Sequence, residues 1–430
     1  MAIIAPFKGL RYNTDKAGEI STLVCPPYDI ISDEERKNYL AVNPHNIIRL
    51  ELPKGDDPYK TAGNTLNEWL RDEILKKDEK EGIYVYEMAF LSHGERKNVK
   101  GIICLVGLEE LSKGIILPHE ETLSKAKTDR FNLMSSTYCN FSQVYSLYND
   151  KDNSTFSIID KVSSGDPDIK LTDDEGVEHR LWCIYDVDEI ARISSKFEDK
   201  KLYIADGHHR YETALAFSKH LREQGIVSGE KGEAPSDYVC MMLVNMENDG
   251  LVVWPTHRII RDLDNFNIGN VLNNDEVLRN FDIVKVDTLE QARDMLEENY
   301  NNEYKSYVLY TGSNFYVFTL RDKSVMKTLF PDASDAYCEL DVSILHSLIL
   351  ERAFGIDKEN MANQINLTYT RSEDEAIAEV REGRANCCFL LNPTRVSEIS
   401  DVAAAGEKMP QKSTYFYPKL ITGLVMNKFL

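Results

Sequence analysis

The sequence predicts an α+β fold that divides into more than one domain. Runs rich in β-branched and aromatic residues follow one another from Gly82 to about Tyr185, which is typical of strands. A strand-like run ending at Ala205 passes through Asp-Gly into a helix-like stretch, and from about residue 275 helix-like and strand-like segments alternate. The chain has 430 residues, too many for a single compact core.

The first 75 residues mix helix and strand signals. Ser32 precedes a run with acidic residues in its first turn, so we expect it to cap a helix. Residues 46–52 alternate and predict a strand that places Arg49 and Glu51 on one face. Residues 61–75 are predicted to be helical.

The later elements are predicted from the same signals. Strands are expected at 83–90, 99–108, 143–148, 202–205, 238–244, 284–286, 306–310, 315–320 and 387–391. A helix follows residue 206 and carries Ala214, Phe217 and Leu221 on one face, and 344–354 is also helical. The acidic, Asn-rich stretch 261–274 is a candidate domain boundary.

Acidic residues dominate the charge. Asp and Glu number 71 against 50 Lys and Arg, and the formal net charge is −21. A field of that sign repels nucleic-acid phosphates, so we do not expect nucleic acid as a partner, although a local basic pocket for a small phosphorylated ligand is compatible with it. No run reaches the roughly 18 apolar residues of a membrane helix, and no signal peptide is evident. We therefore expect no membrane partner and a cytoplasmic location.

The cysteines do not indicate a metal site. None of the eight forms a CxxC pair, so no structural zinc site is predicted. Cys387 and Cys388 sit in an apolar run that predicts a buried strand. We expect these thiols to be small core residues and predict no metal ligands.

The segment 203–217 carries the strongest functional signal. It reads strand, then Asp206-Gly207-His208-His209-Arg210, then helix. The N-terminus of a helix attracts anions, a glycine allows close approach of the backbone, and an Arg one turn in binds phosphate in a two-pronged way. Histidine can carry a proton near neutral pH. The segment predicts a phosphate-binding turn, and the alternative is an ordinary polar turn.

A second polar cluster runs from Pro118 to Arg130. His119 and Glu120 are candidates for acid and base, and Lys127 and Arg130 for phosphate contacts. The alternative is a solvated helix in which Glu and Lys about one turn apart support each other.

A second His-Arg pair, His257-Arg258, follows Trp254-Pro255-Thr256. Placed at a strand end, where ligand sites of α/β proteins gather, it is a candidate phosphate contact. The alternative is a surface loop.

The segment 409–419 resembles a Walker A loop only superficially. Gln411 stands at the second glycine position and Pro410 has no backbone donor, so that reading is rejected. We expect a loop or tail that brings polar side chains to an anion, or else an edge strand with exposed hydroxyls. The candidates are Lys412, Ser413, Thr414 and Lys419.

Taken together, these segments resemble one family. The chain is identified as a member of the bacterial and archaeal domain-of-unknown-function family numbered 1015. The segments that carry the resemblance are Pro26-Pro27-Tyr28-Asp29, Asn43-Pro44-His45-Asn46, Ala205 to Tyr211, Pro255-Thr256-His257-Arg258 and Met409 to Phe416.

The central turn is also similar to the Gly-x-x-Arg phosphate turn of the ParB/sulfiredoxin superfamily, whose free-serine kinases read Asp-Gly-His-x-Arg. This resemblance implies that Gly207 to Arg210 contact phosphate and that Asp206 is the acidic residue before the glycine. It implies an N-terminal carboxylate base, for which Asp29 and Glu51 are both candidates. The expected domains are a core of 1–80 and 186–260, a β-rich insertion of 81–185 and a C-terminal α/β region of 261–430.

The chain also departs from that superfamily. His208 stands where sulfiredoxins have their cysteine, so reduction of sulfinic acids is disfavoured. The chain is much longer than the bare superfamily domain, and it has no obvious basic helix for DNA.

We therefore expect a phosphotransferase or phosphatase acting on a small phosphorylated metabolite or a nucleotide, most specifically with serine or phosphoserine. His208 or His209 would move the proton, and Arg210, Arg258 and Lys412 would neutralise the phosphoryl oxygens. ATP or ADP, and Mg²⁺ held with the help of Asp206, are the cofactors to consider. The alternative is a nucleotide-binding regulator of the ParB type without turnover; a nuclease is the weakest reading, and a homo-oligomer is left open.

Overall fold

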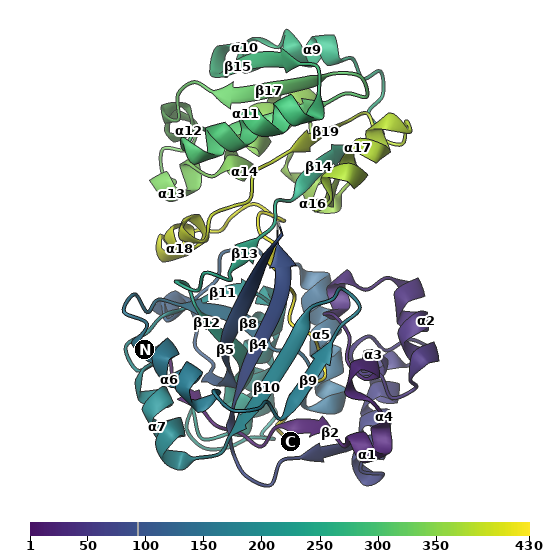
Figure 1. The fold of residues 1–430 in the computed structure, drawn as a ribbon, viewed down its shortest axis with the longest axis vertical. Coiled ribbons are helices and arrows are strands. Elements are labelled where there is room, and N and C mark those ends of the chain that lie inside the picture. Colours follow the sequence, from purple (N-terminus) through teal and green to yellow (C-terminus); the bar gives the residue numbers. More distant parts are fainter. Residues whose placement is uncertain (93) are drawn as a thin grey trace. The chain divides into compact units, whose positions relative to one another are not determined.

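The computed structural model describes residues 1–92 and 94–430, which form two compact units (Figure 1). Unit 1 comprises 1–118, 122–252 and 418–430, and unit 2 comprises 119–121 and 253–417. Both units combine helices with sheets, so the predicted α+β class is confirmed. Among the described residues, no helix is both long and apolar enough to cross a membrane.

Unit 1 is built on a nine-stranded mixed sheet within the described residues. Its order is β6-β11-β8-β12-β5-β4-β10-β9, and β1 pairs with β5. β6 runs parallel to β11 and β8 runs parallel to β12, whereas the other neighbours are antiparallel. The strands are β1 (Ile4–Ala5), β4 (Ile83–Ser92), β5 (Glu95–Gly107), β6 (Ile116–Leu117), β8 (Val144–Tyr148), β9 (Ile169–Thr172), β10 (Glu178–Ile184), β11 (Leu202–Asp206) and β12 (Tyr238–Asn245).

Helices cover this sheet, with α6 and α7 on one flank and α1 to α4 on the other in Figure 1. Two small antiparallel pairs complete the unit: β2 (Leu10–Tyr12) with β3 (Leu75–Lys77), and β7 (Cys139–Asn140) with β21 (Asn427–Lys428). The helices are α1 (Thr14–Ala17), α2 (Asp33–Val42), α3 (Ile48–Glu51), α4 (Pro58–Arg71), α5 (Ser124–Thr137), α6 (Ser154–Val162), α7 (Val187–Ser195) and α8 (His208–Glu223).

Unit 2 contains an antiparallel sheet of order β15-β17-β16-β19-β14-β18. Alternate residues of β16 enter different cores: Tyr307 and Leu309 pack with the segment 345–350, and Val308 packs with α11 and α17. Its strands are β14 (His257–Ile260), β15 (Phe281–Val286), β16 (Ser306–Tyr310), β17 (Phe315–Leu320), β18 (Leu367–Thr370) and β19 (Cys387–Leu390). Short strands β13 (Val252–Val253) and β20 (Phe416–Tyr417) lie where the chain passes between the units.

The helices of unit 2 include one continuous run that changes its winding. The run starts as α14 (Asp341–Ile344), becomes a π-helix at Leu345–Leu350 and ends as α15 (Glu351–Phe354), which confirms the helix predicted over 344–354. The other helices are α9 (Ile268–Leu272), α10 (Asp275–Asn280), α11 (Leu289–Asn301), α12 (Ser324–Leu329), α13 (Asp335–Cys338), α16 (Lys358–Asn363), α17 (Glu373–Arg381) and α18 (Val396–Ala404).

Local sequence signals predicted several elements well. Ser32 caps α2 in a capping box with Glu35, as its position before acidic residues suggested. The strands expected at 306–310 and 315–320 are β16 and β17 with the same bounds. Phe217 and Leu221 on α8 are buried, as the helical period predicted.

Three predictions about organisation differ from the structure. Residues 48–51 form the helix α3 instead of a strand, because Ile48, Leu50 and the adjacent Glu51 are all buried, which does not match the alternation of a strand with one exposed face. The strands of 81–185 do not form a separate insertion, since β4, β5 and β8 share one sheet with β11 and β12. The chain passes between units near residue 252, and the stretch 261–274 lies inside unit 2.

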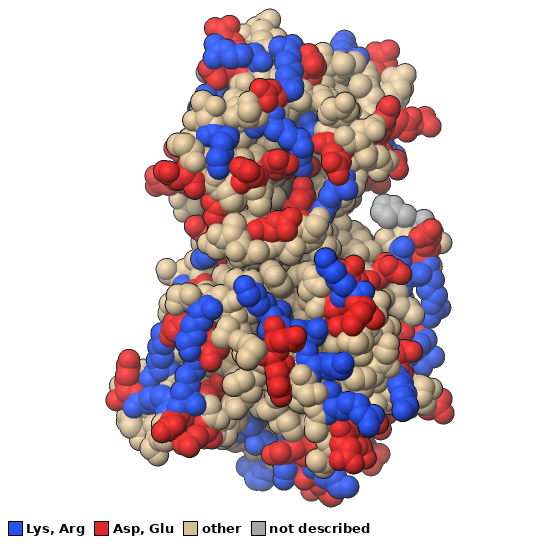
Figure 2. Space-filling model, turned by 90° about the vertical axis from the view of Figure 1, so that its left-hand side faces the viewer, with Lys and Arg blue, Asp and Glu red and all other residues tan. Residues whose placement is uncertain are grey.

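Charges of both signs are interspersed on the face shown in Figure 2. Lys and Arg side chains lie beside Asp and Glu on both the upper and the lower part of that view. This mixture agrees with a chain whose net charge is negative and whose basic residues are mostly used in ion pairs.

Candidate functional site

The predicted turn is present at the C-terminal end of β11. Asp206 is the last residue of the strand, Gly207 follows with φ 92° and ψ 28°, and His208 begins α8. A Cβ added to Gly207 would lie 2.9 Å from Nε of Arg210. The left-handed backbone and this close approach both require glycine. The bend therefore brings Asp206 and Arg210 to the N-terminal end of α8.

The carboxylate of Asp206 forms ion pairs with two cations. Arg210 donates to Oδ2 and Lys419 donates to Oδ1. Burial alone would raise the pKa of Asp206, but the charges of Lys419 and Arg210 outweigh it and hold the pKa well below its ordinary value. Asp206 is therefore an ionised acceptor that fixes the position of Arg210.

Glu51 lies in a buried cluster of the same unit. It comes from the end of α3 and is 2% exposed. Ser142 donates to its Oε1 at 2.9 Å, and Arg130 donates to Oε1 at 3.3 Å and to its carbonyl oxygen at 3.0 Å. Burial raises the pKa of Glu51 despite the nearby Arg130, Ser142 and Arg210. A buried carboxyl whose pKa is raised takes up a proton more readily than an exposed one, which makes Glu51 a candidate for proton transfer.

Arg130, on α5, is held from several sides. It is 5% exposed, pairs with Asp129 at 2.6 Å and stacks on Tyr28, with Cζ 3.8 Å from the ring centroid. The predicted solvated helix is therefore wrong for this residue, which is buried. Its contact with Glu51 makes it a support for the carboxyl as well as a candidate anion ligand.

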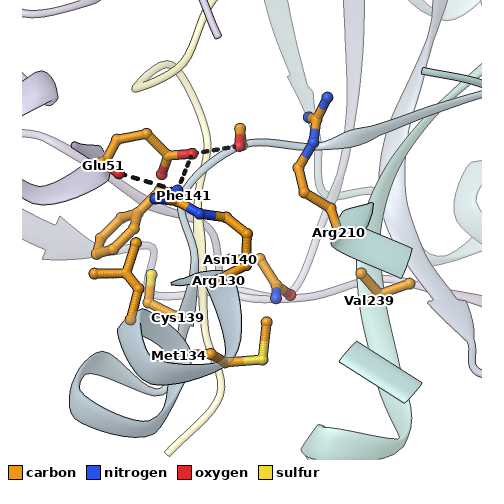
Figure 3. A pocket seen from close by; sticks show the side chains of 10 residues that line it. Glu51, Arg130, Met134, Cys139, Asn140, Phe141, Arg210 and Val239 are labelled. Atoms are coloured by element: carbon orange, nitrogen blue, oxygen red, sulfur yellow. Dashed lines mark hydrogen bonds and ion pairs between the residues drawn. The ribbon is translucent and has the colours of Figure 1, made fainter. Parts of the chain in front are cut away.

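One small pocket brings these groups together. Figure 3 shows Glu51, Arg130 and Arg210 among the residues that line it, together with Cys139, Asn140 and Phe141. Its volume is about 30 Å³, the room of about one water molecule. The pocket thus connects the buried carboxyl to the arginine of the Asp-Gly turn.

The two histidines of the turn differ in their surroundings. His208 is 3% exposed, and its charge contributes to the low pKa of Asp206. His209 is partly exposed, and its Nε2 accepts from the backbone N–H of Leu123 at 2.8 Å. That contact ties the turn to the segment before α5.

The predicted cluster 118–130 is divided between the two units. Lys127 pairs with Glu212 of α8 at 2.9 Å in unit 1. His119 and Glu120 belong to unit 2, where Nε2 of His119 lies 3.0 Å from Oγ1 of Thr414. Glu120 accepts from the backbone N–H of Lys412 at 3.5 Å. Only Arg130 of this cluster lines the pocket with Glu51.

His257 and Arg258 are the first residues of the strand β14 of unit 2, so they lie at the N-terminal end of a strand. His257 accepts from the backbone N–H of Leu391 at 3.2 Å, and burial lowers its pKa to about 4. The pair is buried within the sheet, which also excludes the surface loop considered as the alternative.

The segment 409–419 is likewise divided. Lys412, Ser413 and Thr414 lie in unit 2, and the Ser413 hydroxyl donates to the carbonyl of Pro410 at 2.5 Å. Lys419 lies in unit 1 and pairs with Asp206. Of the four residues expected at an anion, Lys419 is the one that joins the turn of unit 1.

The donor set does not fit a magnesium ion held by Asp206, because Lys419 and Arg210 occupy both of its carboxylate oxygens. Among the described residues, no group of three or more His, Cys, Asp or Glu side chains is arranged to hold a metal. Asp29 lies in the 3₁₀ turn Tyr28–Ile30, and its charge acts on Glu51.

Sequence reasoning did not single out three residues that build this site: Tyr28 as a stacking partner, Ser142 and Gln143. Gln143 accepts a hydrogen bond from Arg210 through its carbonyl oxygen, and its side chain donates to Val425 at 2.5 Å. No motif marked Ser142 and Gln143, because their role depends on a loop between β7 and β8 that only the fold brings to Glu51 and Arg210.

The comparisons with known proteins identify a family. The model of the family described as "Protein of unknown function (DUF1015)" matches residues 4–343, which confirms the family predicted from the motifs. No curated protein matches the chain.

Solved structures show distant likenesses. A conserved hypothetical protein from Pyrococcus furiosus is 13% identical, with a TM-score of 0.33 over 74% of this chain and 94% of that chain. Free serine kinase in complex with AMP is 12% identical, with a TM-score of 0.35 over 74% and 90%. SbnI with a C-terminal truncation, from Staphylococcus aureus, is 9% identical, with a TM-score of 0.33 over 76% and 87%. These values are too low to establish a shared activity.

Proposed function

The chain belongs to the DUF1015 family of proteins of unknown function, and from the geometry of its site we propose that it transfers a phosphoryl group to or from a small hydroxyl-bearing metabolite. The observation that carries the proposal is that a buried carboxyl with a raised pKa, Glu51, lines one pocket with Arg210 of the Asp-Gly turn.

The turn would bind the phosphate. The N-terminal end of α8 carries a partial positive charge, and Arg210 adds a guanidinium whose further N–H donors suit phosphate oxygens. Lys419 adds a second cation held by Asp206. Phosphoryl transfer depends mainly on positioning and on neutralising charge, and this group of residues supplies both.

Glu51 would act as the base. The acceptor hydroxyl would pass its proton to the Glu51 carboxylate while its oxygen forms the new bond to phosphorus, and the bond from phosphorus to the leaving phosphate oxygen would break. The pocket has room for a group about as large as a hydroxyl or one water, which suits an acceptor oxygen at Glu51 with the phosphate outside at the turn. We assign the base to Glu51 over Asp29 because Glu51 lines this pocket.

The substrates to test first are serine with ATP or ADP. The Asp-Gly-His-His-Arg turn is similar to that of free-serine kinases, and a small acceptor is consistent with a pocket of about 30 Å³. A phosphoserine phosphatase would use the same groups with water as the acceptor.

The test is to incubate the protein with serine and ATP or ADP and to follow phosphoserine, AMP and inorganic phosphate by phosphorus NMR. We expect turnover in the wild type and a loss of about a hundredfold or more in kcat for Glu51→Gln. Glu87→Gln is the matched control, because Glu87 is a buried carboxylate of unit 1 that lies outside this pocket. Equal turnover in Glu51→Gln and Glu87→Gln would remove Glu51 from the mechanism, and nucleotide binding without any product would favour the regulator.

A further inference from the structure

Unit 2 contains a buried arginine with no carboxylate partner. Arg258 is 0% exposed, and among the described residues no acidic side chain forms an ion pair with it. It donates to the carbonyl oxygens of Thr256 and, at 3.2 Å, Lys412, and its Nε has no hydrogen-bond partner within the described chain. A buried charge without a counter-charge is costly, so something must offset it.

Tyr369 and His346 also have buried polar atoms that lack a hydrogen-bond partner within the described chain. Tyr369 is the β18 residue opposite Arg258 in the sheet, and the guanidinium lies 5.3 Å from its ring centroid. His346 lines one pocket together with Tyr369, and burial, followed by the charge of Arg258, lowers the pKa of His346. The Tyr369 hydroxyl and Nε2 of His346 have no hydrogen-bond partner among the described residues. Three orphaned polar groups at one place indicate a missing ligand rather than an isolated packing defect.

The backbone at His346 is also unusual. His346 lies in the π-helix Leu345–Leu350, a winding that is rare and occurs often at functional sites. It projects from an otherwise α-helical run between α14 and α15. The unusual winding is a second observation that points to this place.

A pocket opens onto two of these groups, His346 and Tyr369, whereas Arg258 is buried beside the Tyr369 ring and does not line the pocket. It has a volume of about 190 Å³ and is lined by His346, Ser347 and Tyr369, by Lys358 and Lys408, and by Glu121 and Glu351, all within unit 2. This is smaller than the roughly 300–1,000 Å³ of pockets for drug-sized ligands. The volume suits a small metabolite better than a whole nucleotide.

We propose that unit 2 binds a small metabolite in this pocket through an oxyanion, carboxylate or phosphate, which His346 and Tyr369 contact and whose charge balances the buried guanidinium of Arg258 beside Tyr369. The imidazole and the phenol supply the hydrogen bonds, and the guanidinium supplies the positive charge behind them. Carboxylate and phosphate share this chemistry, and the pocket is also lined by Glu121, Glu351, Lys358 and Lys408, which suit a ligand that carries a second polar group.

The experiment uses the full chain and hydrogen–deuterium exchange with two probes, inorganic phosphate and acetate. Binding in unit 2 is expected to slow exchange in peptides that cover 256–260, 343–350 and 367–370. Peptides that cover 203–215 report separately on the turn of unit 1, so failure of one site is distinguishable from failure of the other. Protection by phosphate alone assigns a phosphate ligand, and protection by acetate assigns a carboxylate.

Arg258→Met and Tyr369→Phe test the residues. Arg258→Met is expected to abolish the protection while leaving the ligand-free protein at least as stable, because an unpaired buried charge is replaced by an apolar side chain. Tyr369→Phe is expected to weaken binding by about tenfold. Arg395→Met is the control, since Arg395 donates to the carbonyl of Tyr300 and lies outside the pocket. No protection by either probe in the wild type, or equal protection in Arg258→Met, would overturn the proposal.

Discussion

At the scale of one residue, the two cations Arg210 and Lys419 keep Asp206 ionised. Because its pKa is held well below the ordinary value, ionised Asp206 stabilises the fold above the unfolded pKa of about 3.9, and this contribution is lost as the pH falls. Asp206→Asn would remove the negative charge between Arg210 and Lys419 and one of the two acceptor oxygens, and is expected to cost about 3 kcal/mol at about pH 7. In denaturant unfolding, the difference in the free energy of unfolding between wild type and Asp206→Asn should become smaller below about pH 4. A difference that does not change with pH would show that the ion pairs of Asp206 do not stabilise the folded protein.

The pKa of Glu51 is shifted in the opposite direction to that of Asp206. Its raised pKa means that the folded protein holds the proton more tightly than the unfolded chain, so its contribution is largest below about pH 4.3 and is lost as the pH rises through the folded pKa. The free energy of unfolding of wild type relative to Glu51→Gln should therefore fall as the pH rises above about 4.3. Glu87→Gln, measured over the same range, is the control. A stability difference that rises with pH would contradict the raised pKa.

Residue type predicted part of the site and could not predict the rest. The turn 206–210 was visible because strand, glycine and arginine are adjacent in the chain. Glu51 stayed one of two candidates, since its contacts with Arg130 and Ser142 span 79 and 91 residues. Arg258 was marked as an anion ligand, but nothing in the sequence joined it to His346 and Tyr369.

At the scale of an element, the bend between β11 and α8 depends on Gly207. Gly207→Ala combines a positive φ with a Cβ 2.9 Å from Arg210 and is expected to lower the free energy of unfolding by about 1–3 kcal/mol and to displace the guanidinium. Gly114→Ala is the matched control, because Gly114 also has a positive φ but nothing lies within 4 Å of its Cβ. Equal losses in both variants, measured by denaturant unfolding, would mean that the contact with Arg210 is unimportant.

Elements were predicted best where the pattern is long or strongly β-branched. β16 and β17 have the predicted bounds, and α8 buries the predicted face. The strand predicted over residues 46–52 was wrong because so short an apolar pattern also fits one turn of helix. The packing of α3 against α2 and α4 decides between the two, and the local sequence does not show it.

At the scale of the molecule, the last residues of the chain belong to unit 1. Val425 and Met426 are fully buried, and Met426 exchanges backbone hydrogen bonds with Leu10 at 2.8 and 3.0 Å. A chain that ends after Tyr417 should lose protection from hydrogen exchange in β8 and β11 while the strands of unit 2 keep theirs. Removal of Leu430 alone, which is 47% exposed, is the control. Unchanged exchange in β8 and β11 would contradict the assignment of 418–430 to unit 1.

This return of the chain is also why the predicted domains were wrong. Sequence signals mark where a composition changes, but they do not show that 418–430 closes the first unit or that the strands of 81–185 share a sheet with β11. Both depend on contacts between residues far apart in the chain, which a local pattern does not encode.

Binding of a phosphate by the turn 206–210 beside Glu51 is tested most directly by a crystal structure with ADP and serine. We expect density for a phosphate at the backbone of residues 207–210 and at Arg210, with the serine hydroxyl at the pocket of Glu51. ADP phosphates ordered elsewhere on the chain, with the turn unchanged and Arg210 still held by Asp206 and Gln143, would contradict it.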